Sequence, residues 1–311
     1  MHKWMQSLLM SLLLNVTGVV WGLDRNGFDL SDSLVPVAEI HGGGPARDGI
    51  PALNHPAFLA ADQADFLTPN DRVLGLSRHG VAKAYPIAIL NWHEVVNDQF
   101  GAEPVVVTFC PLCGTGMAFL ATVDGRALEF GVSGLLYNSD VLLYDRQTES
   151  LWSQIMTTAI SGPLKGQRLT MTPVAHTTWA DWRQRYPDTL VLSPETGHSR
   201  DYGRDPYAGY VQSEQVMFPL RFKSQRFHPK ESVIGVVIDG RAKAYPFSEL
   251  ERATTPLMDT LGQRPVRIEY DAAHRTGRVL DATGQEIPSV ISFWFAWYGF
   301  HPNTEVYTAA P

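Results

Sequence analysis

The chain has 311 residues, of which 44% are hydrophobic and 18% are charged, with 26 glycines, 21 prolines and 2 cysteines. These proportions are typical of a globular protein with a substantial core, and they exclude a disordered, collagen-like or disulfide-rich chain. The formal net charge of -7 is the opposite of what a nucleic-acid-binding surface needs, so we expect no nucleic-acid partner.

Residues 1–22 resemble a secretory signal peptide. A short basic start at Lys3 is followed by an apolar run, and the small residue Gly22 precedes the charged Asp24. An uncleaved N-terminal anchor is the alternative, although the run barely reaches the roughly 20 apolar residues that span a bilayer. No later stretch is as long and apolar, so we expect a mature chain in the periplasm or outside the cell, without stable membrane insertion.

The rest of the chain contains an internal repeat. Residues 73–90 resemble residues 233–250, and after a slip of one position residues 100–109 resemble residues 261–270. The spacing is too wide and the copies are too few for a solenoid. The repeat therefore indicates a duplicated module.

The first copy shows what each module is expected to contain. Residues 73–85 predict a β-hairpin, and Pro86 predicts the start of a helix whose apolar stripe ends near Asp98. Residues 105–109 predict a strand, and a second hairpin turns at Asp124-Gly125. The module is thus hairpin, helix, strand, hairpin, and we expect an α+β fold that is mainly antiparallel β.

These patterns divide the chain into five segments. They are a signal peptide at 1–22, a loop-rich segment at 23–70, a first module with the cysteine site at 71–146, a linking region at 147–230 and a second, degenerate module at 231–311. We expect the modules to pack as one globular unit. In the linking region a short helix is predicted before Pro187. Near the C-terminus, residues 293–298 form an aromatic run that predicts a core strand, with the wall of a binding site as the alternative.

The one compact group of reactive residues is Cys110-Pro111-Leu112-Cys113-Gly114, after the predicted strand. It is similar to a zinc-ribbon or rubredoxin knuckle, in which N–H groups point at the sulfurs and the glycine takes a positive φ. A ribbon needs a second cysteine pair, which this chain lacks, so His, carboxylate, Met or water would complete the site. Three alternatives stay open: a redox-active disulfide, a structural disulfide and a pair of inert buried thiols.

Two histidines are the candidate further ligands of a metal at Cys110 and Cys113. His93 lies on the predicted helix just before the cysteine strand, and His301 follows the aromatic run. Each has a plain structural alternative, as a capping or turn residue. Met117 suits a soft ion but is also a natural core residue. Thiolate with imidazole suits copper or zinc.

A second polar cluster offers weak candidates for catalysis. Asp140, Asp145 and Arg146 stand close to buried-type aromatic residues, and Glu94 adjoins the candidate ligand His93. Paired carboxylates can carry out acid–base chemistry, but salt-bridged turns are the commoner explanation of such a cluster.

Taken together, these sequences resemble the prokaryotic family called domain of unknown function 3179. The resemblance covers nearly the whole mature chain and rests on residues 48–51, 84–86, 93–98, 108–114, 130–140, 145–154, 200–202 and 293–302. The family name supplies no activity. It implies that the His-Glu helix, the cysteine pair and the C-terminal Trp/His segment belong to one pattern.

The sequence therefore supports the hypothesis of an exported metal-binding protein with copper or zinc at Cys110, Cys113, His93 and His301. With an open coordination position, the site could serve a metalloenzyme. The alternatives are a thiol–disulfide redox protein and a non-catalytic envelope protein with a structural disulfide. The partner would be an unidentified small molecule or a metal donor.

Overall fold

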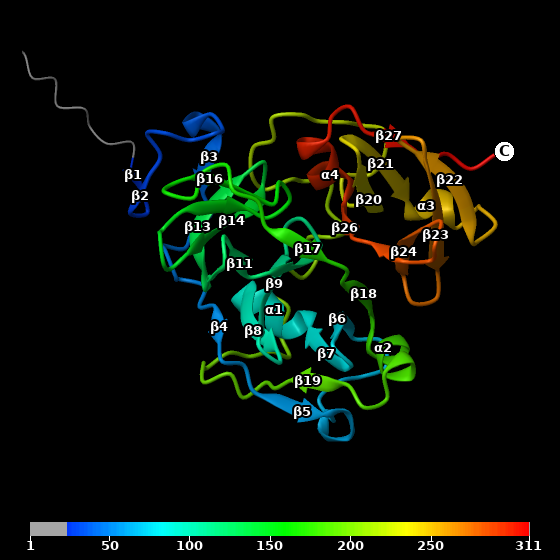
Figure 1. Cartoon of the computed structure of the whole chain (residues 1–311), viewed down its shortest axis with the longest axis horizontal. Helices are drawn as coiled ribbons and strands as arrows, with labels where there is room; N and C mark the ends of the chain where they lie inside the picture. The colour runs from blue at the N-terminus through cyan, green and yellow to red at the C-terminus, as the bar shows by residue number, and fades with distance from the viewer. Residues whose placement is uncertain (1–23, 311) are drawn as a thin grey trace, which may run out of the picture.

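The computed structural model describes residues 24–310, so the predicted signal peptide at 1–22 lies outside the described part. The described part is mostly β, with 42% of residues 24–310 in strands and 11% in helices. It forms five blade-like sheets of four or five strands, joined by short helices and long loops (Figure 1). The prediction of an α+β fold built from hairpin-helix modules is therefore wrong, because its helices are short, four to seven residues in the α-helices, and the sheets carry the core.

Two of the sheets make up what we call the first lobe. Their inner faces share one apolar core, which includes Leu74 and Tyr85 from one sheet and Val107 from the other. The first sheet has the order β18 (Ala175–Thr178), β6 (Arg72–Arg78), β7 (Val81–Pro86), β19 (Leu190–Leu192), β5 (Phe58–Ala60). The second has the order β17 (Thr170–Thr172), β10 (Thr115–Leu120), β9 (Glu103–Cys110), β8 (Val95–Phe100), β4 (Leu53–Asn54).

The second lobe repeats this arrangement around a core that includes Ile234 and Ile268. One sheet has the order β26 (Val290–Phe293), β20 (Ser232–Ile238), β21 (Arg241–Pro246), β27 (Glu305–Val306). The other has the order β22 (Leu257–Leu261), β23 (Arg264–Asp271), β24 (Thr276–Asp281), β25 (Glu286–Ile287). Both lobes keep a lysine–aspartate pair, Lys83 with Asp98 at 2.8 Å and the more exposed Lys243 with Asp259 at 2.6 Å.

The fifth sheet, which we call the middle sheet, belongs to the first copy of the repeat alone. Its order is β16 (Thr158–Ser161), β15 (Leu151–Ser153), β14 (Asp140–Asp145), β13 (Phe130–Tyr137), β3 (Ile40–Gly42). Its four later strands lie between β10 and β17 in the chain, whereas β24 leads directly to β25 in the second copy. Two small ribbons complete the strands, β1 (Asp24–Arg25) with β2 (Phe28–Asp29) and β11 (Thr122–Val123) with β12 (Arg126–Ala127).

The duplication extends further than the sequence comparison indicated. The α-helices are α1 (Ile87–His93), α2 (Trp179–Arg185), α3 (Phe247–Leu250) and α4 (Trp294–Phe300), and the 3-10 helices are η1 (Val37–Glu39) and η2 (Ala61–Gln63). Trp182 of α2 covers Gly75, and Trp297 of α4 covers Gly235, where a Cβ atom would stand 2.2 Å from either indole. Each helix leads into a strand parallel to its hairpin, β19 beside β7 and β27 beside β21.

Two of the expected local structures differ in the structure. The helix after Pro86 does not reach Asp98, because Glu94 takes a left-handed φ of 58° and the β-branched residues that follow enter β8. The aromatic run is helix α4 and not a strand. Its tryptophans, three positions apart, share the helix face that packs on β20. The short helix before Pro187 is confirmed as α2, and both repeat hairpins are confirmed by the registers of β6 with β7 and β20 with β21.

Within residues 24–310, no helix combines the length and the hydropathy needed to cross a membrane.

Candidate functional site

The cysteine pair lies in the turn that joins β9 to β10. Cys110 ends β9, the N–H of Cys113 donates to the Cys110 carbonyl at 3.1 Å, and Gly114 has the positive φ, 60°, that the knuckle pattern predicts. Both thiols are free and buried. The turn is fixed to the second lobe, because the N–H of Phe293 donates to the Cys113 carbonyl at 2.8 Å and the Phe293 ring covers Gly114.

A carboxylate from the middle sheet completes the group. The two-residue turn between β13 and β14 has Asn138 and Ser139 at positive φ, and it delivers Asp140 to the sulfurs. The Cys110 and Cys113 sulfurs and an Asp140 oxygen all lie within 4.8 Å of one another. Asp140 Oδ2 accepts from the Ile155 N–H at 3.1 Å, whereas buried Oδ1 has no hydrogen-bond partner among residues 24–310.

Glu94 is a buried carboxyl close enough to interact electrostatically with Asp140 and Cys110, although it lies outside the 4.8 Å group. It is 7% exposed, and its left-handed backbone ends α1 while its carbonyl accepts from the Phe109 N–H, next to Cys110. A left-handed glutamate costs about 1 to 3 kcal/mol and is concentrated at functional positions. No basic side chain in the described range forms an ion pair with Glu94 or Asp140.

Burial makes all four groups weak acids in the metal-free protein. Desolvation raises the pKa of Glu94 to about 8, with the Asp140 charge adding to the effect, and it raises the pKa of Asp140 to about 7. Desolvation also raises the pKa of Cys110, and that of Cys113 well above its usual value. Four buried acids without a counter-charge are stable only when they hold protons or share a cation.

The structure does not bring either predicted histidine into this group. His93 is buried, but Nδ1 contacts the Pro51 carbonyl at 2.7 Å and Nε2 contacts the Tyr202 hydroxyl at 2.6 Å, so both nitrogens are occupied. His301 stacks on Trp297, with ring centroids 4.1 Å apart, at the end of α4. Burial lowers the pKa of each histidine to about 4, so both are neutral at pH 7.

The weak catalytic candidates separate into two sets. Asp140 and Glu94 lie at the cysteine group. Asp145 instead accepts from the Thr148 N–H at 2.7 Å and from the Trp152 indole at 2.9 Å, which makes it a structural residue of a turn. Arg146 forms ion pairs with carboxylates on the surface beside the middle sheet. Met117 is core, in the same apolar cluster as the cysteines.

A covering segment is the part of the site that sequence reasoning missed. Residues 194–230, which we call the strap, contain no helix or strand and run from β19 to β20 (Figure 1). Tyr210 of the strap is buried in the cluster that holds both cysteines, and Tyr207 packs against that cluster. The alternation of partly buried Val216, Phe218 and Leu220 with exposed neighbours is a period-two signal that could have indicated one inward-facing side.

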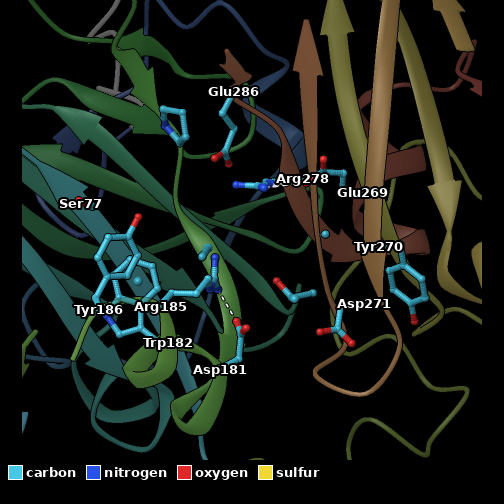
Figure 2. Close-up of a pocket in the computed structure, with 15 residues that line it drawn as sticks. Ser77, Asp181, Trp182, Arg185, Tyr186, Glu269, Tyr270, Asp271, Arg278 and Glu286 are labelled. Atoms are coloured by element: carbon cyan, nitrogen blue, oxygen red, sulfur yellow. Dashed lines mark hydrogen bonds and ion pairs between the residues drawn. The ribbon is translucent and has the colours of Figure 1, made fainter. Parts of the chain in front are cut away.

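A separate cleft of about 280 Å³ lies between α2 of the first lobe and β23 and β24 of the second (Figure 2). Asp181 and Asp271 line it, and together with His274 they form the other group of possible metal ligands among the described residues. These groups are already paired, since Asp181 forms an ion pair with Arg185 and Asp271 contacts His274 Nδ1 at 2.6 Å. The cleft therefore lacks the unpaired charge of the cysteine site.

The repeat relates the two groups. The position of Cys110 corresponds to Asp271, and that of Cys113 to His274, after the one-residue slip. A family model described as protein of unknown function (DUF3179) matches residues 47–304. The chain belongs to this family. The resemblance expected from the sequence is thereby confirmed, and the family description states no activity. No curated protein and no solved structure matches the chain.

Proposed function

We propose that this chain is an exported metal-binding protein whose ligands are Cys110, Cys113 and Asp140, with Glu94 beside them. The single observation that carries the proposal is the convergence of two buried thiols and a carboxylate within 4.8 Å, with Asp140 Oδ1 left without a partner. Ligand atoms bound at about 2.0 to 2.3 Å lie within about 4.6 Å of one another, so a small adjustment would place all three on one ion.

The donor set favours zinc over copper. Zn²⁺ accepts thiolate and carboxylate together in tetrahedral sites, whereas Cu⁺ selects sulfur and imidazole over carboxylate oxygen. The fourth position would fall to water or to Glu94, whose charge interacts with those of Asp140 and Cys110 although its carboxylate lies outside the 4.8 Å group. With water in that position, the site could serve a metalloenzyme.

The same observations count against the redox alternative. Thiol–disulfide exchange uses a thiolate, which neighbouring cations or a helix N-terminus stabilise. Here burial raises the pKa of both thiols and the neighbouring charges are acidic. Export itself rests on residues 1–22 and is tested by sequencing the N-terminus of the protein recovered from the periplasm.

Elemental analysis of freshly purified protein tests the proposal. We expect about one zinc per chain, lost in Cys113→Ser and Asp140→Asn and retained in the control His301→Asn, because His301 lies away from the sulfurs. Cobalt substitution gives an independent readout, since thiolate-to-cobalt charge transfer appears only when sulfur binds the ion. Absence of metal, or metal that persists in Cys113→Ser, would overturn the proposal. If the protein instead contains one copper per chain, and the copper is lost in the same variants, the ligand assignment stands and the ion is copper.

A further inference from the structure

The thiols and carboxyls of the site are sealed from solvent. Cys110 is 1% exposed, and Cys113 and Asp140 are 0% exposed. A metal ion or a substrate therefore cannot reach them unless some element moves. β9, β10 and β14 are central strands paired on both sides, so they are poor candidates for that movement. Phe293, which also covers the turn, belongs to β26, whereas the strap is the cover that belongs to no sheet.

The strap meets the site through a few polar contacts. The Arg221 N–H donates to Asn138 Oδ1 at 2.8 Å, and the Ser139 hydroxyl donates to the Phe218 carbonyl at 3.3 Å. The Ser139 carbonyl in turn lies 3.3 Å from the Cys113 sulfur. The strap thus touches the same two-residue turn that presents Asp140.

Lys230 links the end of the strap to its middle. Its side chain donates to the Ser213 carbonyl at 2.7 Å and to the Gln215 carbonyl, and the ammonium lies 4.3 Å from the centre of the Tyr210 ring. Lys230 is 4% exposed, and within residues 24–310 its ammonium bonds carbonyl oxygens and no carboxylate. Because this buried lysine donates to two backbone carbonyls and contacts the Tyr210 ring, it is well placed to act as a latch between the end of the strap and its middle.

A second attachment lies at the start of the strap. The Tyr202 hydroxyl contacts His93 Nε2 at 2.6 Å and the Thr196 hydroxyl at 2.6 Å. Between the two attachments the segment has no ladder of backbone hydrogen bonds, so it can open without disrupting a sheet.

We propose that the strap is a gate over the cysteine site, latched by Lys230, and that its opening controls how metal enters and leaves. This inference rests on the proposed metal site for its purpose. The gate itself can be measured on the thiols of metal-free protein, and that separates its failure from a failure of the metal site.

The test is the rate at which N-ethylmaleimide modifies the two cysteines of metal-free full-length protein under native conditions. In wild type this rate exceeds the rate that global unfolding allows. Lys230→Gln increases it about tenfold or more, because losing two hydrogen bonds shifts the opening equilibrium. The matched control is Lys243→Gln, a half-buried lysine of the second lobe, which changes the rate only as far as it changes global stability. If Lys230→Gln does not fold, Tyr202→Phe decides, with an expected severalfold increase.

Modification rates that follow global unfolding in every variant would overturn the gate, even if zinc binds with full stoichiometry. Conversely, if Lys230→Gln is modified faster but the wild-type protein contains no metal, the gate is supported and the proposed metal site is refuted. Where zinc does bind, its transfer to a chelator accelerates in Lys230→Gln while the zinc content stays at one per chain. An unchanged transfer rate would refute control of metal exchange by the strap.

Discussion

Glu94 gives the metal-free protein a pH dependence whose sign follows from the site. Burial raises its pKa from 4.5 to about 8 in the folded chain. The native state therefore holds a proton that the unfolded state releases, so the stability contributed by this group is present below about pH 4.5 and is lost as the pH rises through about 8. Between about pH 5.5 and 8 the loss is about 3 kcal/mol.

Glu94→Gln removes this dependence, because glutamine has the shape of the protonated acid and cannot ionise. In urea unfolding with a chelator present, we expect the variant to match wild type near about pH 5 and to exceed it by about 3 kcal/mol near about pH 8. The control is Glu195→Gln at an exposed position of the strap, which keeps the wild-type slope. Equal pH slopes for Glu94→Gln and wild type would show that the carboxyl is not held protonated in the fold.

Three further predictions concern the same framework. Gly114→Ala lowers the free energy of unfolding by at least about 2 kcal/mol, since its φ is 60° and the new Cβ would stand 2.7 Å from the Phe293 ring; an unchanged urea midpoint would refute this. Asp98→Ala lowers the free energy of unfolding by about 3 to 5 kcal/mol, because it leaves the buried Lys83 ammonium without its carboxylate partner. Asp259→Ala, in the more exposed pair of the second lobe, lowers it by less. Calorimetry that ranks the two variants the other way contradicts the reasoning. Zinc affinity rises at least about tenfold per pH unit between about pH 6 and 8, because zinc binding displaces protons from the ligands. A competition titration in which the affinity does not change with pH would show that carboxyls and thiols are not the ligands.

The sequence pattern predicts correctly those features that depend on residues close together in the chain. The Asp-Gly turns, the paired hairpins and the positive φ after the second cysteine depend on residues that are neighbours in sequence, and the structure confirms them. The family membership was also readable from the motifs. The prediction of a strand in the aromatic run is wrong, because a short apolar stretch fits both the helical and the strand period. The residues form helix α4, whose apolar face packs on β20.

Which side chain lies beside the cysteines was decided by the tertiary structure. Asp140 reaches the sulfurs because the middle sheet, an insertion in the first copy, lays a two-residue turn over the β9–β10 knuckle. His93 was the nearer candidate in sequence, yet α1 ends in a left-handed residue that leaves Glu94 beside the site and directs the imidazole to Pro51 and Tyr202. Sequence spacing determines which chemical groups a turn can present. Only the packing of distant strands decides which of them meet, because burial and hydrogen bonding select among side chains that local pattern treats alike.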